Sequence, residues 1–232
     1  MKNFVFSSLI ALLALQTGFF LLSTTACGET PSREHPLVVD KERAQIQIAG
    51  YVQAREFNRK PFLSIGHVRN YHAIAWEGGN VKKSDILFVS YADDLSIHNA
   101  LMNIGGIPGN NLTLDTWNKR GYPLHPEPNK KVEGTQVKVS VAWEGAPRNY
   151  SIQELLNDTG GKGITPRFGG NKEHIPVWKS GCILCLYSCP GGKISNASYT
   201  VNDYAAGSTH FSAREDILPS DGTEVIITLS LN

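Results

Sequence analysis

The chain has 232 residues, of which 41% are hydrophobic, and its 22 Lys plus Arg residues nearly balance its 21 Asp plus Glu residues. This composition excludes a disordered tail, a collagen-like fibre and a multi-pass membrane protein, and it predicts one or at most two compact domains. A nucleic-acid partner is not expected, because binding to phosphates requires a clustered basic surface.

The chain begins with a predicted export signal, residues 1–26. Lys2 supplies a positive start, an apolar stretch runs from Phe4 to Leu22, and small residues precede Cys27. The pattern resembles a bacterial lipobox, which implies a lipid on Cys27 and a membrane-anchored lipoprotein in the periplasm or on the cell surface. Cleavage that leaves a soluble extracytoplasmic protein and an uncleaved anchor are the alternatives. The polar residues 27–36 are predicted to be a tether.

Most of the remaining chain has the pattern of β-strands. Alternation of apolar and polar residues predicts half-buried strands at residues 44–48, 137–143 and 225–231. A continuous apolar run at residues 86–89 predicts a central strand that is covered on both faces. Tyr199 and Val201 suggest a further strand before Asp203.

Two short helices are predicted. The first is capped by Asp93 or Asp94 and runs to about Ile104. The second runs from Ser151 to about Asn157, because Ser-Ile-Gln-Glu at its start has the pattern of a capping box. The predicted fold is therefore α+β, a β-dominated single domain with two short helices and long loops.

His67, His72 and His98 are predicted to be ordinary surface or core histidines. His67 and His72 are five residues apart, so on a strand they point to opposite faces and do not form a metal pair. Asp94 and His98 are interpreted as a helix cap and a solvated histidine. No hydrolase elbow or phosphate-binding loop is present, so no catalytic residue is assigned and a non-enzymatic role is favoured.

Three of the four cysteines, Cys182, Cys185 and Cys189, lie within eight residues of one another. Outside the cytoplasm, neighbouring thiols oxidise unless they are paired or bind a metal. We therefore predict a metal or redox site on these cysteines, with His174, His210 or a second molecule as the source of a fourth ligand. The glycines beside the loop are expected to serve positive φ angles.

Several states of these cysteines remain open. Zinc and copper(I) prefer sulfur ligands and can bind after export. The spacing C-x2-C-x3-C-P resembles the end of the bacterial ferredoxin run, whose first cysteine would fall at Lys179, and a cluster would have to be assembled outside the cell. The other states are a structural disulfide, a reducible pair of Cys182 and Cys185 that exchanges thiols, and three buried thiols.

Two segments resemble the YdjY-type family of uncharacterised bacterial exported proteins, which are often labelled ferredoxin-like. They are residues 94–109, with His98, Gly105 and Pro108-Gly109, and residues 167–203 around the cysteine loop. The resemblance covers about residues 37–232 and implies a YdjY-like domain there. The label implies a 4Fe-4S site on the three cysteines of the loop, and it implies no substrate or reaction.

These observations together predict a lipid-anchored extracytoplasmic protein. Its cysteine loop is expected to bind a soft metal ion or an iron–sulfur cluster, or to exchange thiols, for a redox partner in the membrane. The alternative is a structural or binding module whose loop is held together by a disulfide.

Overall fold

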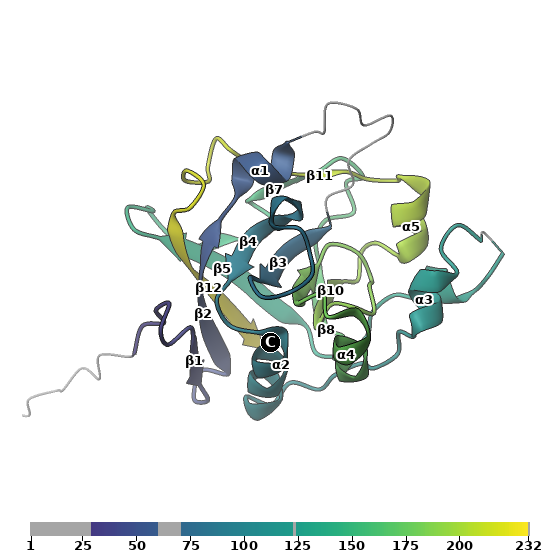
Figure 1. Ribbon diagram of the computed structural model, residues 1–232, viewed down its shortest axis with the longest axis horizontal. Helices are drawn as coiled ribbons and strands as arrows, with labels where there is room; N and C mark the ends of the chain where they lie inside the picture. Colours follow the sequence, from purple (N-terminus) through teal and green to yellow (C-terminus); the bar gives the residue numbers. More distant parts are fainter. Residues whose placement is uncertain (1–28, 60–70, 123, 232) are drawn as a thin grey trace, which may run out of the picture.

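The structure is a computed structural model that describes residues 29–59, 71–122 and 124–231 (Figure 1). The predicted export signal, Cys27 and His67 lie outside the described residues. Within the described ranges, no helix is both long enough and apolar enough to cross a membrane. The described part of the predicted tether packs on the domain, because the Pro36 carbonyl accepts a hydrogen bond from the Ala49 N–H at 2.9 Å.

Ten strands of the described chain form one mixed sheet in the order β6-β5-β12-β2-β4-β3-β9-β10-β8, with β1 also paired to β2. Neighbouring strands are antiparallel except for the parallel pairs β3–β4 and β9–β10. The sheet strands are β1 (Leu37–Asp40), β2 (Gln45–Val52), β3 (His72–Trp76), β4 (Ile86–Ser90), β5 (Val137–Trp143), β6 (Tyr150–Ser151), β8 (Pro166–Phe168), β9 (Cys182–Cys185), β10 (Ile194–Asn196) and β12 (Glu224–Leu231). A second sheet pairs β7 (Leu156–Asp158) with β11 (Phe211–Ala213).

The large sheet curls until β8 approaches β5. The Phe168 N–H donates to the Thr135 carbonyl at 2.8 Å, and Gln136 forms an isolated antiparallel bridge with Arg167. The three strands predicted from alternation are confirmed as β2, β5 and β12, and the apolar run is confirmed as β4, whose five residues are all buried. The protein is thus β-dominated, as predicted.

The described residues contain five α-helices, which is more than the two predicted. They are α1 (Ala54–Asn58), α2 (Asp94–Asn103), α3 (Leu114–Asn118), α4 (Ile175–Trp178) and α5 (Val201–Ala206), and three short 3-10 helices accompany them, η1 (Lys83–Asp85), η2 (Glu127–Asn129) and η3 (Lys172–His174). Four of the α-helices have six residues or fewer, which is too short for a periodic pattern to appear in the sequence. In Figure 1, α1 and α2 lie at opposite ends of the sheet.

The first predicted helix is confirmed as α2. Asp93 is its N-cap and accepts a hydrogen bond from the Ser96 N–H at 2.7 Å, and Gly105 follows the helix with a φ of +97°. His98 was predicted to be solvated, and this is wrong. Its side chain is buried and packs edge-on against Phe168, with ring centroids 5.2 Å apart.

The second predicted helix is wrong, although its local hydrogen bonds form. The Ser151 N–H and hydroxyl both donate to the Glu154 carboxylate at 2.8 Å, as in a capping box. The chain nevertheless makes a turn and enters β7, because the pairing of β6 with β5 and of β7 with β11 outweighs one short helix.

The strand predicted at Tyr199 and Val201 is also wrong. Thr200 caps α5 instead, and its hydroxyl and the Asp203 carboxylate form a capping box across the first turn of that helix. The apolar residues at positions 199 and 201 are both buried, one just before the helix and one at its first position. Burial at two alternate positions is therefore compatible with a helix start as well as with a strand.

Candidate metal centre

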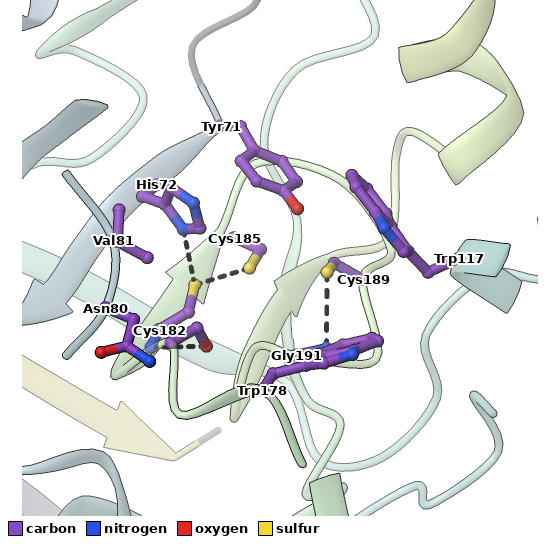
Figure 2. Close-up of a pocket in the computed structure, with 11 residues that line it drawn as sticks. Tyr71, His72, Asn80, Val81, Trp117, Trp178, Cys182, Cys185, Cys189 and Gly191 are labelled. Atoms are coloured by element: carbon purple, nitrogen blue, oxygen red, sulfur yellow. Dashed lines mark hydrogen bonds between the residues drawn. The ribbon is translucent and has the colours of Figure 1, made fainter. Parts of the chain in front are cut away.

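Adjacent strands bring His72 to two of the cysteines. β3 and β9 pair antiparallel with His72 opposite Cys185 and Ala75 opposite Cys182, and the register shifts twice between these pairs. In a regular strand, residues three apart point to opposite faces. The irregular pairing lets both cysteine side chains of β9 turn to the same side, where they face His72 (Figure 2).

The donor atoms of these three side chains converge. The Nδ1 atom of His72 lies 3.1 Å from the Sγ atom of Cys182, and this sulfur lies 2.6 Å from the Sγ atom of Cys185. All three atoms lie within 4.8 Å of one another. No other group of three or more His, Cys, Asp or Glu residues in the described parts of the chain converges in this way, and the described cysteines form no disulfide.

Cys189 extends the cluster from the turn after β9. Its thiol is hydrogen-bonded with the Cys185 thiol and the Tyr71 hydroxyl, and it accepts from the Gly191 N–H at 3.4 Å. The Ser195 hydroxyl donates to the Cys189 carbonyl at 2.9 Å and holds the turn in place. The Cys185 sulfur is thus in contact with both of the other sulfurs.

The two glycines after Cys189 are required by close packing. A Cβ atom on Gly191 would lie 2.6 Å from the indole ring of Trp178, and one on Gly192 would lie 2.9 Å from the Cys185 sulfur. Neither glycine has a positive φ, so the expectation of such angles is wrong here, whereas Gly170, on the other side of the cysteines, does have a φ of +78°. They are needed because the backbone itself forms part of the wall around the sulfurs.

A cavity of about 280 Å³ opens beside the sulfurs and has aromatic walls. Figure 2 shows Tyr71, Trp117 and Trp178 arranged around Cys189. The rings of Tyr71 and Trp117 stack at 5.4 Å between centroids, and the Tyr204 ring stacks with both of them. The cavity is a route by which a small ion can reach thiols that are otherwise buried.

Burial makes the site electrically neutral when it is empty of metal. It raises the pKa of the Cys182 and Cys185 thiols, and the hydrogen bond with Cys185, together with burial, raises the pKa of Cys189. Burial also lowers the pKa of His72 to about 4, so its imidazole is neutral and keeps a lone pair for a metal. A bound ion would displace the thiol protons and create thiolates.

The two histidines predicted as fourth ligands lie elsewhere. The Nδ1 atom of His174 lies 2.9 Å from the Pro190 carbonyl, and the backbone of His210 pairs with Thr159 next to β11. Neither belongs to the group of converging donor atoms. His72, which the sequence interpretation took for an ordinary histidine, lies beside the cysteines instead, and nothing in the sequence links it to Cys182, which is 110 residues away.

The donor set suits one soft ion. Three thiols and an imidazole are ligands that both zinc and copper(I) accept. A 4Fe-4S cluster, which the ferredoxin-like label implies, takes four cysteines as a rule and binds each of them on a different iron atom. Its ligands must therefore stand farther apart than the converging atoms of His72, Cys182 and Cys185, and these residues do not fit such a cluster.

Comparison with known proteins gives the family. A profile of the YdjY domain matches residues 37–230, a range that holds the sheet except for the last residue of β12 and all the residues of the candidate centre. The uncharacterized protein YdjY of Escherichia coli (strain K12) is 37% identical over 162 residues, which are 69% of this chain and 67% of that protein. No solved structure gives a significant match. The chain belongs to the YdjY domain family.

Proposed function

We propose that this protein binds one soft metal ion, zinc or copper(I), through His72, Cys182, Cys185 and Cys189. The observation that carries the proposal is the convergence of the first three donor atoms within 4.8 Å, beside a cavity of about 280 Å³. Neutral imidazole and thiol groups that share one buried space form a ligand set once the thiols lose their protons.

The observed distances allow an ion to enter with a small movement. Two sulfurs at about 2.3 Å from a tetrahedral ion are roughly 3.7 Å apart. The Cys182 and Cys185 sulfurs are 2.6 Å apart, so they must separate by about 1 Å to hold an ion. The movement is confined to side chains of one strand and requires no rearrangement of the sheet.

Thiol exchange between Cys182 and Cys185 is the second candidate, and their sulfur contact favours it. In that reaction the two thiols would lose two electrons and two protons to a disulfide of another molecule. Exchange requires an exposed thiolate with a lowered pKa. Both thiols are at most 1% exposed and burial raises the pKa of each, which argues for the metal site.

We also propose that the domain is held at the outer face of the cytoplasmic membrane or on the cell surface by a lipid on Cys27. The support is the lipobox-like sequence before this cysteine. A membrane protein on the same face would then give or receive the metal ion. Labelling of cells with radioactive palmitate should mark the wild-type protein and leave the Cys27→Ala variant unmarked, and equal labelling of the two would contradict the anchor.

The metal site is tested by titration of the full chain, purified in reduced form without oxygen. Cobalt(II) serves as the coloured probe for a zinc site, and competition with a coloured chelator measures copper(I). We expect one ion per chain and a strong sulfur-to-cobalt absorption band. The variants Cys182→Ser, Cys185→Ser, Cys189→Ser and His72→Ala should each weaken binding by about tenfold or more, since each removes one ligand.

His35→Ala is the matched control, because His35 is exposed and belongs neither to the converging donor group nor to the lining of the cavity. Its affinity should equal that of the wild type. A wild-type protein that binds no ion at one equivalent would contradict the proposal, and so would full affinity in the Cys182→Ser and Cys185→Ser variants. If a single disulfide and an inert third thiol are found instead, the cysteine loop is structural.

A further inference from the structure

The exposed side of α2 carries apolar side chains and no charge. Four residues of this helix are exposed, and their spacing places them on one stripe, which consists of Leu95, Asn99, Met102 and Asn103. A surface helix normally turns charged and polar side chains toward the solvent. Here the Leu95 and Met102 side chains are 39% and 46% exposed, and Ile107, three residues after the helical C-cap, is 70% exposed.

β1 extends this surface at the C-terminal end of α2. Val39 of β1 is exposed, and it lines one groove together with Asn103 of the helix. Figure 1 shows β1 and α2 side by side at the same end of the sheet. The two acidic and two basic residues that line the groove balance each other in charge, so its character is set by the apolar side chains. The α2 surface is defined here as Val39, Leu95, Met102 and Ile107.

The residues that lead into β1 are fixed on the domain and do not form a free tether. Pro31 is buried. The Arg33 guanidinium lies 4.8 Å from the centre of the Tyr91 ring and 3.8 Å from the Glu77 carboxylate. Together with the hydrogen bond to the Pro36 carbonyl, these contacts set the direction from which the chain reaches the domain.

That direction is from the α2 surface. Glu29 and Thr30 line the same groove as Val39. Only Gly28 separates Glu29 from Cys27, and two residues of fully extended chain span at most about 7 Å. A lipid on Cys27 would therefore hold the α2 surface close to the bilayer, because so short a connection leaves the domain little freedom to turn away.

We propose that the α2 surface contacts the membrane, and that its partner is the phospholipid bilayer in which Cys27 is anchored. Its exposed apolar side chains enter the headgroup region, as those of helices that lie in a membrane interface do. This inference rests on the lipid anchor proposed above and deepens it, since it names the face that the domain turns to the membrane.

This orientation places the sulfur cavity near the bilayer. The short helix α4 lies between the two, because its Ile175 lines a hollow with Leu95 and its Trp178 lines the sulfur cavity. A membrane protein would then reach the cavity while the domain stays on the bilayer.

The test places the photo-crosslinker p-benzoylphenylalanine at position 102 or at position 55 of the full chain, in bacterial cells whose phospholipids carry radioactive phosphate. Position 55 is the control, because Arg55 is exposed on α1, which lies at the opposite end of the sheet (Figure 1). Irradiation should transfer radioactivity to the protein from position 102 and none from position 55. Equal labelling from both positions, no labelling from position 102, or its cross-linking to another protein would overturn the proposal.

A second measurement separates this inference from the anchor itself. If palmitate labelling shows no lipid on Cys27, the proposed anchor fails, and the surface is tested with the unanchored Cys27→Ala chain on vesicles of phosphatidylethanolamine and phosphatidylglycerol. In that chain, Leu95→Ser and Met102→Ser should each weaken binding to the vesicles by about fivefold, because each removes apolar area that the bilayer covers.

Leu124→Ser is the matched control for the vesicle experiment. Leu124 is 99% exposed, but it belongs to the loop after α3, which Figure 1 shows well apart from α2. Its substitution should leave vesicle binding unchanged. Equal binding of the Leu95→Ser, Met102→Ser and Leu124→Ser chains, or no binding by the unsubstituted Cys27→Ala chain, would overturn the inference.

Discussion

Raising the pH from 6 to 8 should strengthen zinc binding, and the size of the increase depends on how many thiols lose a proton when the ion binds. Each of the three thiols has a raised pKa and is protonated in the metal-free protein over this range, so each releases one proton when zinc binds. His72, with a pKa of about 4, is already neutral and releases none. Each proton adds a factor of ten per pH unit, so three thiols give about a millionfold, or about 8 kcal/mol, over two units.

The assay is competition with a chelator whose own pH dependence is known, supported by calorimetry in buffers with different ionisation enthalpies. The logarithm of the affinity should rise with a slope of three per pH unit in the wild type. In Cys189→Ser the slope should fall to two, because only Cys182 and Cys185 remain. A slope of one or less in the wild type, or an unchanged slope in Cys189→Ser, would refute the three-thiol site.

Three further predictions concern the metal-free fold. The pKa of His72 is about 4 in the folded state and about 6.5 in the unfolded state, so this residue should contribute about 3 kcal/mol to the free energy of unfolding. The contribution is fully present above pH 6.5 and is lost as the pH falls to 4. Urea unfolding across this range should show the loss in the wild type but not in His72→Phe. Gly192→Ala should lower the free energy of unfolding by about 1–3 kcal/mol, because the added Cβ atom meets the Cys185 sulfur, and an unchanged melting temperature would contradict the packing. Asp158→Asn should lower the free energy of unfolding by about 2 kcal/mol, because the carboxylate accepts hydrogen bonds from the Tyr199 hydroxyl at 2.6 Å, the Thr209 hydroxyl and the Gly163 N–H. Amide hydrogen exchange in residues 158–163 should become faster in this variant. Unchanged exchange would argue against this hydrogen-bond network.

The strands that could be predicted from the sequence are those with one face in the core and one in water, together with β4, whose apolar run is buried on both faces. β12 pairs with β2 and β5 along its length, and all three strands show their alternation in the sequence. Ser151 and Glu154 form the hydrogen bonds that the sequence suggested, but a capping box satisfies a turn as well as a helix. The strand partners decide between these two outcomes, and one of them, β11, lies far along the chain from β7.

The candidate site, like the fold, could be predicted from the sequence only in part. The three cysteines are visible in the sequence because they lie close together in it. His72 is invisible there, because it reaches Cys182 only through the pairing of β3 with β9. The role of Gly192 depends equally on tertiary packing, since the Cys185 sulfur lies only 2.9 Å from where its Cβ atom would be. Lys193 follows the glycines as an ordinary lysine, and nothing in the sequence indicates that it is fully buried.

The most direct test of the metal centre is X-ray absorption spectroscopy of the full chain loaded with one equivalent of zinc. The proposed ligands predict three sulfur neighbours at about 2.3 Å and one nitrogen neighbour at about 2.0–2.1 Å. In His72→Ala the nitrogen contribution should be lost or replaced by a water oxygen. A wild-type spectrum that contains only nitrogen and oxygen neighbours would contradict a site built on the three cysteines.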